Sequence, residues 1–237
     1  MTRHRSFIYE YGGCQLPSVN LAGHRNPADN GCKFIGPEIT TCQNLGIKVL
    51  ISIGGAYGRR QSLTDSTDAK YLADYIYNNF LGGYAPNRLF GDAALDGVDF
   101  DLESPSSYLD DLAKYLHVYS TPQRKAYLSA APQRIFPDAN IGAALNTGLL
   151  DYVWIQFYNN PPCQYNGDSQ NLIAAWKKWT SSINARYFFV GLPGSPQAAG
   201  SGYANSTQIC KEILPEIKKS AKYGGVMIWL QNQSRDH

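Results

Sequence analysis

The segment Leu95–Glu103, which reads Leu-Asp-Gly-Val-Asp-Phe-Asp-Leu-Glu, constrains the fold more than any other part of the chain. It has the apolar residues of a buried β-strand, yet Asp99, Asp101 and Glu103 place a carboxylate at every second position. Because side chains alternate between the two faces of a strand, these acids share one face and the apolar residues share the other.

Three carboxylates on one face of a buried strand indicate chemistry rather than stability. Like charges held close together raise each other's pKa values, and burial adds to the rise. One carboxyl group of such a set can stay protonated near neutral pH and act as a general acid. A solvated edge strand and a cation site are the structural alternatives, and the apolar opposite face argues against the solvated edge.

Length and charge exclude several classes of protein. The 237 residues could hold one large domain or two small ones, and because barrels of this size usually form one domain, we expect a single domain over residues 1–237. With 21 basic and 19 acidic side chains, the chain has no charge excess that favours nucleic acid or a membrane surface. No apolar run approaches the ~18 residues that span a bilayer, and the basic start at Met1–Ser6 has no apolar stretch of signal-peptide length after it.

The remaining metal-ligating residue types show no site pattern. The four histidines have no ligand spacing, and the five cysteines contain no Cys-x-x-Cys pair. We therefore expect neither a metal nor a cofactor.

Strand-like and helix-like segments alternate along the chain, which predicts parallel βα units. The predicted strands are Phe7–Tyr11, Ile47–Ile53, Leu95–Glu103, Lys125–Ala131, Tyr152–Tyr158, Tyr187–Leu192 and Gly225–Trp229, and the clearest helices are Thr67–Phe80, Ser107–Tyr119, Asn171–Asn184 and Thr207–Lys219. This order predicts the α/β class, with a (β/α)8 barrel of the TIM type that is one strand short. Active sites of such barrels lie at the carboxyl ends of the strands, where Glu103 stands.

Other candidate site residues stand near predicted strand ends. Gln156 and Tyr158 lie two residues apart at the end of one strand, and Trp229 ends the last strand. Each aromatic residue has a core-packing alternative. Asn20 is expected in a loop, where turn chemistry is its alternative role.

Residues Asp96–Glu103 resemble the DGxDxDxE signature of glycoside hydrolase family 18, and the wider chain resembles plant class III chitinases of the hevamine type. The supporting stretches are Asn20–His24, Ser52–Gly55, Ala130–Gln133, Tyr152–Cys163 and Leu214–Ser220, and the resemblance runs from Phe7 to Trp229. It implies an endochitinase that acts on chitin or N-acetylglucosamine oligomers as a monomer, in an extracellular or vacuolar location.

The resemblance also implies a substrate-assisted mechanism, in which the N-acetyl oxygen of the sugar replaces a carboxylate nucleophile. Glu103 would be the acid and then the base, and Asp101 would orient the acetamido group. Asp99 would share a proton with Asp101, and Tyr158 would donate its hydroxyl to the acetamido oxygen.

The same resemblance implies three substrate-binding residues. Gln156 would position the acetamido group, Trp229 would lie under the sugar at the cleavage point, and Asn20 would bind sugar hydroxyls. The resemblance further implies a cis peptide bond between Trp229 and Leu230.

The chain departs from the family at its ends and its cysteines. The first strand and helix and the last helix of the family have no counterpart, so we expect an incomplete barrel with exposed strand edges. None of the family's three disulfides can form in its usual pairing, because Arg25 and Arg134 stand where Cys32 and Cys163 would find partners. The partner of Cys42 would precede Phe7. With five cysteines, at least one thiol stays free or pairs between chains.

Two other functions compete with the enzyme. The first is a chitinase-like lectin or glycosidase inhibitor on the same fold. Such relatives usually lose the acid or its aspartate neighbour, whereas Glu103 and Asp101 are both present here. The second is a fragment that does not fold alone, because the missing elements and disulfides could outweigh the ~5–15 kcal/mol by which a domain is normally stable.

Overall fold

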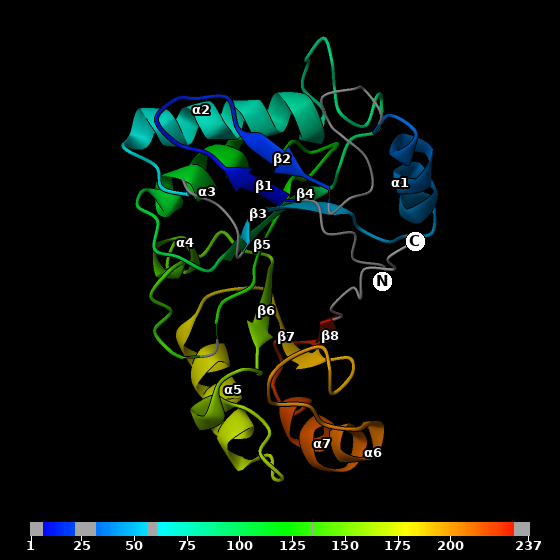
Figure 1. Ribbon diagram of the computed structural model, residues 1–237, viewed down its shortest axis with the longest axis vertical. Coiled ribbons are helices and arrows are strands. Elements are labelled where there is room, and N and C mark those ends of the chain that lie inside the picture. Colours follow the sequence, from blue (N-terminus) through cyan, green and yellow to red (C-terminus); the bar gives the residue numbers. More distant parts are fainter. Residues whose placement is uncertain (1–6, 22–31, 56–60, 134, 230–237) are drawn as a thin grey trace. The chain divides into compact units, whose positions relative to one another are not determined.

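The computed structural model describes residues 7–21, 32–55, 61–133 and 135–229 (Figure 1). The chain divides into two compact units, Met1–Ala130 with Ala139–Leu150 and Ala131–Asp138 with Asp151–His237. Strands and helices alternate in both units, so the predicted α/β class is confirmed. The single domain expected over residues 1–237 stays a prediction.

The described part of the first unit contains a sheet in the order β2-β1-β3-β4-β5. Its strands are β1 (Phe7–Glu10), β2 (Ser18–Asn20), β3 (Leu50–Gly55), β4 (Gly97–Leu102) and β5 (Tyr127–Ala130). Neighbouring strands from β1 to β5 run parallel, whereas β2 pairs antiparallel with β1. The four strands predicted here are confirmed. The unpredicted β2 forms a hairpin with β1 rather than another βα unit.

Helices follow the strands of this unit. They are α1 (Ile35–Asn44), α2 (Ser66–Ile76) with its π-helical continuation η2 (Tyr77–Leu81), α3 (Leu109–Val118) and α4 (Gly142–Leu145). Helices α2 and α3 pack against each other (Figure 1). Both of these were predicted, whereas α1 and the single turn α4 were not.

The second unit has three described strands, which are parallel in the order β6-β7-β8. They are β6 (Tyr152–Gln156), β7 (Tyr187–Pro193) and β8 (Tyr223–Trp229). The helical segments are η3 (Pro161–Cys163), α5 (Gln170–Ser182) and the continuous run α6 (Ser206–Gln208), η4 (Ile209–Ile213) and α7 (Leu214–Ile217). The predicted strands and helices of this unit are therefore confirmed.

Strand β4 is buried on both faces, since all six of its residues are buried. Two-sided burial is expected for a strand inside a parallel sheet. Its first residue is Gly97, where a Cβ atom would lie 1.9 Å from the carbonyl oxygen of Tyr127 on β5. Glycine thus allows β4 and β5 to approach closely.

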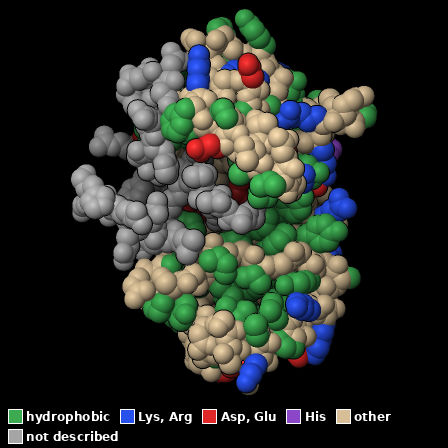
Figure 2. All heavy atoms as spheres, turned by 90° about the vertical axis from the view of Figure 1, so that its right-hand side faces the viewer, with side chains coloured by type: hydrophobic (Ala, Val, Ile, Leu, Met, Phe, Trp, Pro, Cys, Tyr) green, Lys and Arg blue, Asp and Glu red, His purple; other side chains and the backbone are tan. Residues whose placement is uncertain are grey.

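On the face shown in Figure 2, the Lys and Arg side chains of the described residues are spread out rather than gathered in one cluster. None of the described helices is long and apolar enough to cross a membrane.

A buried carboxylate fastens the β1–β2 turn to helix α2. Asp68, on the first turn of α2, is 1% exposed and accepts hydrogen bonds from the amides of Gly13 (2.7 Å), Cys14 (2.7 Å) and Thr64 (3.0 Å). Burial by itself raises the pKa of this carboxyl, but the hydrogen bonds outweigh that effect and hold the pKa of Asp68 below its ordinary value.

Replacing Asp68 by Asn tests this anchor. A group whose pKa is lowered by folding stabilises the protein above its unfolded pKa, and this contribution is lost as the pH falls through the folded pKa. At pH 7 we expect Asp68→Asn to reduce the free energy of unfolding by about 2–4 kcal/mol. The difference should shrink when urea denaturation is repeated below pH 4, under the ordinary aspartate pKa of about 3.9. An equal difference at both pH values would contradict the assignment.

Candidate active site

The acidic motif lies where its spacing predicts, along β4 and at its carboxyl end. Asp99 and Asp101 are 5% and 6% exposed within the strand. Strand β4 ends at Leu102, so Glu103 is the first residue beyond it, and its side chain is exposed. The structure therefore places two buried carboxyl groups below an accessible one.

Asp99 is held by serines from both neighbouring strands. Ser129 on β5 donates its hydroxyl to Oδ1 at 2.5 Å, and Ser52 on β3 donates to Oδ2 at 3.1 Å. Both serines are the register partners of Asp99 in the sheet. Each carboxyl oxygen of this buried residue thus has a hydroxyl donor, as burial of a polar group requires.

Gly54 brings the end of β3 close to Asp101. It pairs with Asp101 in the sheet register and has a φ of +102°. A Cβ atom at this position would lie 2.5 Å from the carbonyl oxygen of Asp101. A residue larger than glycine would therefore displace the backbone that carries the central aspartate.

Asp96, the first acid of the motif, has a structural role. Its Oδ2 accepts hydrogen bonds from Gln43 Nε2 of α1 and from the amide of Val49, both at 2.9 Å. Asp96 precedes β4, so it lies at the opposite strand end from Glu103.

Gln61 is a buried polar residue that the sequence did not single out. Its amide nitrogen contacts the carbonyl oxygens of Tyr9, Gly54 and Gly55, and its oxygen accepts from the hydroxyl of Ser104. Ser104 directly follows Glu103, so Gln61 connects β1 and β3 to the turn that carries Glu103. A single glutamine outside the predicted strands and helices carries no local signal for this role.

Asn20 lies on β2, three places from β4 in the order of the sheet. The loop predicted for it is wrong, because it is the exposed last residue of β2. Sheet register runs from Asn20 through Phe7 and Ser52 to Asp99. Three strand spacings of about 4.8 Å separate Asn20 from Asp99, or about 14 Å.

The second unit brings Tyr158 and Trp229 together. Their rings stack with centroids 6.2 Å apart at 19°. Tyr158 is 5% exposed and belongs to a buried cluster with Trp154 and Met227, against which Trp229 packs. The prediction that Tyr158 ends its strand is wrong, because β6 stops at Gln156, whereas Trp229 is the last residue of β8 as predicted.

Gln156 is engaged with backbone groups of its own unit. Its side-chain Nε2 donates to the carbonyl oxygen of Ala131 at 2.8 Å, and its backbone N–H donates to the carbonyl oxygen of Pro132 at 3.1 Å. This side chain fastens β6 to the segment before it.

Two further expectations concern the peptide bond after Trp229 and the cysteines. The cis bond between Trp229 and Leu230 lies outside the described residues, as do Arg25 and Arg134. The expectation of at least one free thiol is confirmed, and the free thiols include Cys14, Cys42 and Cys210.

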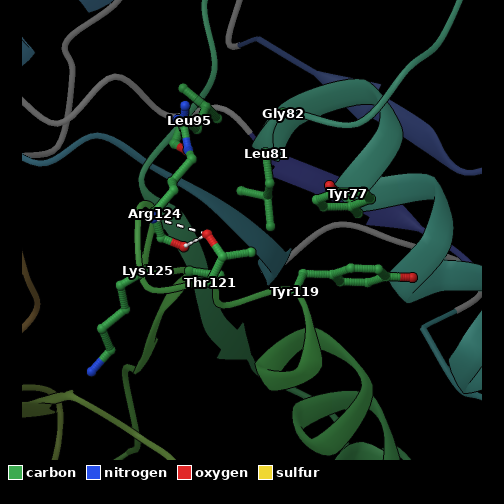
Figure 3. A pocket seen from close by; sticks show the side chains of 9 residues that line it. Tyr77, Leu81, Gly82, Leu95, Tyr119, Thr121, Arg124 and Lys125 are labelled. Carbon is green, nitrogen blue, oxygen red and sulfur yellow. Dashed lines mark hydrogen bonds between the residues drawn. The ribbon is translucent and has the colours of Figure 1, made fainter.

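A small cavity of about 90 Å³ lies in the first unit, at the other end of the strands from Glu103 (Figure 3). Leu95 and Ala126, which line it, come just before β4 and β5. Its remaining lining residues are Tyr77, Leu81, Gly82, Tyr119, Thr121, Arg124 and Lys125. Since β4 spans six residues, five rises of about 3.3 Å, or about 17 Å, separate its two ends, and the cavity is not part of the acidic site.

Within the described ranges, no group of three or more His, Cys, Asp or Glu side chains is arranged to hold a metal ion.

Comparison with known proteins places this chain in a family. Residues 25–208 match the profile of glycosyl hydrolases family 18. The chain is 53% identical to an acidic endochitinase of Arabidopsis thaliana over 226 residues, which cover 94% of this chain and 74% of that protein.

Solved structures extend the comparison to three dimensions. The ICChI chitinase of Ipomoea carnea matches with a TM-score of 0.91 and 44% identity, over 94% of this chain and 83% of that one. A xylanase and alpha-amylase inhibitor protein of Scadoxus multiflorus matches with a TM-score of 0.86 and 38% identity, over 94% and 81%. These matches confirm the fold class expected from the sequence, α/β of the (β/α)8 TIM type.

The two serines on Asp99 should differ in importance. Ser129 is fully buried and makes the shorter bond, so its loss leaves an oxygen of Asp99 without that donor. We expect Ser129→Ala to lower the free energy of unfolding by about 2–3 kcal/mol. Ser52→Ala, at a half-buried position with a longer bond, should cost less. Urea denaturation of both variants measures the difference, and equal losses would contradict it.

Proposed function

Because the chain belongs to family 18 of the glycosyl hydrolases, we propose that it is an endochitinase that cleaves β-1,4-linked N-acetylglucosamine polymers. The observation that carries this proposal is the exposed Glu103 at the carboxyl end of β4, directly beyond the buried Asp99 and Asp101. Barrel enzymes keep their catalytic groups at this end of the strands.

The proposed reaction proceeds with substrate assistance. Glu103 gives its proton to the glycosidic oxygen that leaves, while the acetamido carbonyl oxygen of the same sugar attacks the anomeric carbon and forms an oxazolinium ion. Glu103, now a carboxylate, then removes a proton from water. The water oxygen forms a bond to the anomeric carbon as the bond from that carbon to the acetamido oxygen breaks. The oxazolinium ring is thus opened, the original configuration is restored, and Glu103 is left protonated.

The two aspartates support this step from inside the sheet. Asp101 accepts a hydrogen bond from the acetamido N–H, which orients the group and stabilises the positive charge of the intermediate. Asp99 shares a proton with Asp101. Hydroxyl donors on both oxygens of Asp99 keep its carboxyl group in one orientation for this exchange.

The substrate-binding roles fall to the other predicted residues. Tyr158 donates its hydroxyl to the acetamido oxygen, and Gln156 helps to position that group. Trp229 provides the apolar surface beneath the sugar at the cleavage point, where an aromatic ring suits the apolar face of a pyranose. Asn20 binds sugar hydroxyls farther from the bond that breaks.

A second candidate function is inhibition of another glycosidase. Its support is the match to the xylanase and alpha-amylase inhibitor protein, which shares this fold at 38% identity. The presence of both Asp101 and an exposed Glu103 favours hydrolysis.

We propose that the protein acts as a monomer in an extracellular or vacuolar location.

Substitution of Glu103 by Gln tests the proposed acid. The variant keeps the shape of the side chain but cannot transfer the proton, so we expect the hydrolysis rate of an N-acetylglucosamine tetramer to fall at least about a hundredfold. Glu38→Gln makes the same change at an exposed position on α1 and should keep the original rate. No cleavage by the unaltered protein, or full cleavage by Glu103→Gln, would refute the proposal.

Substrate assistance requires the acetamido group. We expect β-1,4-linked oligomers of glucose or of unacetylated glucosamine to remain uncut, although they fit a similar cleft, because they carry no carbonyl oxygen that can attack. Product analysis by mass spectrometry compares them with the N-acetylglucosamine tetramer. Cleavage of the glucose oligomer at a similar rate would exclude this mechanism while leaving glycoside hydrolysis in place.

A further inference from the structure

Glu103 lies between two residues that are tied to other parts of the first unit. On its amino side, Asn140 Nδ2 donates to the carbonyl oxygen of Leu102 at 3.4 Å. On its carboxyl side, Ser104 Oγ donates to Gln61 Oε1 at 3.3 Å. The side chain of Glu103 is exposed, so these backbone neighbours set its position more than packing does.

Gln61 is itself firmly anchored. It is 7% exposed, and its Nε2 donates to the carbonyl oxygens of Tyr9 (3.0 Å), Gly54 (3.1 Å) and Gly55 (3.2 Å). Only the NH₂ end of the amide can face three carbonyl oxygens, so the oxygen end must point the other way, toward Ser104. The orientation of the amide is therefore determined by its surroundings.

We infer that Gln61 is a positioning residue that holds Glu103 at the carboxyl end of β4 through the hydroxyl of Ser104. The inference rests on the proposed function, because it takes Glu103 to be the acid. Gln61 carries no charge and no transferable proton, so its effect is geometric. A displacement of a catalytic group by about 1 Å can cost a hundredfold in rate, and a fixed turn prevents such a displacement.

The same amide also touches the strand beside Asp101. Gly54, whose carbonyl oxygen accepts from Gln61, is the register partner of Asp101. Gln61 thus relates the turn that carries Glu103 to the strand end next to Asp101. A shift of one relative to the other would change how the acid and the acetamido-binding group meet the same sugar.

The first test removes only the exposed hydroxyl. We expect Ser104→Ala to lower kcat for the N-acetylglucosamine tetramer about fivefold, the equivalent of about 1 kcal/mol, with KM and Tm unchanged. Ser104→Thr, which restores a hydroxyl, should recover the rate. Ser107→Ala removes an exposed hydroxyl from the same turn and should keep the original kcat.

The second test asks whether Gln61 acts through Ser104. Gln61→Ala should lower kcat at least as much as Ser104→Ala does, and combining the two changes should lower it no further, because the hydrogen bond is already lost. Independent, multiplicative losses would overturn the inference. So would an unchanged kcat in Ser104→Ala, or a failure of Ser104→Thr to recover the rate.

Hydrogen–deuterium exchange separates this inference from the proposed function. The amides of Glu103, Ser104 and Ser106 should exchange faster in Ser104→Ala than in Ser107→Ala, and equal exchange overturns the tether whatever the activity. If the two variants exchange as expected but the unaltered protein cleaves nothing, the proposed function fails, while the contact between Gln61 and Ser104 stands. The role of Gln61 in positioning an acid is then overturned as well.

Discussion

The site depends on how a carboxyl group can be kept inside a parallel sheet. Asp99 is buried among apolar strands, and Ser52 and Ser129 donate to its two oxygens from the same row of the sheet on either side. This match fixes the register of three strands at once, because a slip by one residue would replace each hydroxyl by an apolar side chain. The same register places Asp101 and Glu103 farther along the chain, at the carboxyl end of β4.

Most of the strands could be predicted from the sequence because each is a compact apolar run bounded by turn residues. The segments that escaped prediction have weak local patterns. Strand β2 is the three-residue Ser-Val-Asn, and it exists through its pairing with β1. Helix α1 contains Gly36 and Pro37 in its first turn and buries few side chains, so its amphipathic pattern is faint.

Within the candidate site, the spacing of the acids was enough to place them, since alternation along a strand is a local property. The hydrogen bonds around them were not predictable, because Ser129 is 30 residues from Asp99 in the chain and Gln61 is 43 residues from Ser104. A lone serine inside an apolar strand was the available signal for Ser129. The position of Tyr158 beyond β6 shows the opposite error, in which an apolar run outlasts the strand it predicts.

The partial exposure of Trp229, which stacks on Tyr158, has a practical consequence. Three of the four tryptophans, Trp154, Trp176 and Trp179, are 6% exposed or less, whereas Trp229 is partly accessible. A water-soluble collisional quencher therefore reaches Trp229 far more readily than the others. The quenching of Trp229 fluorescence therefore measures whether the end of β8 is covered. The measurement needs neither a label nor turnover of a substrate.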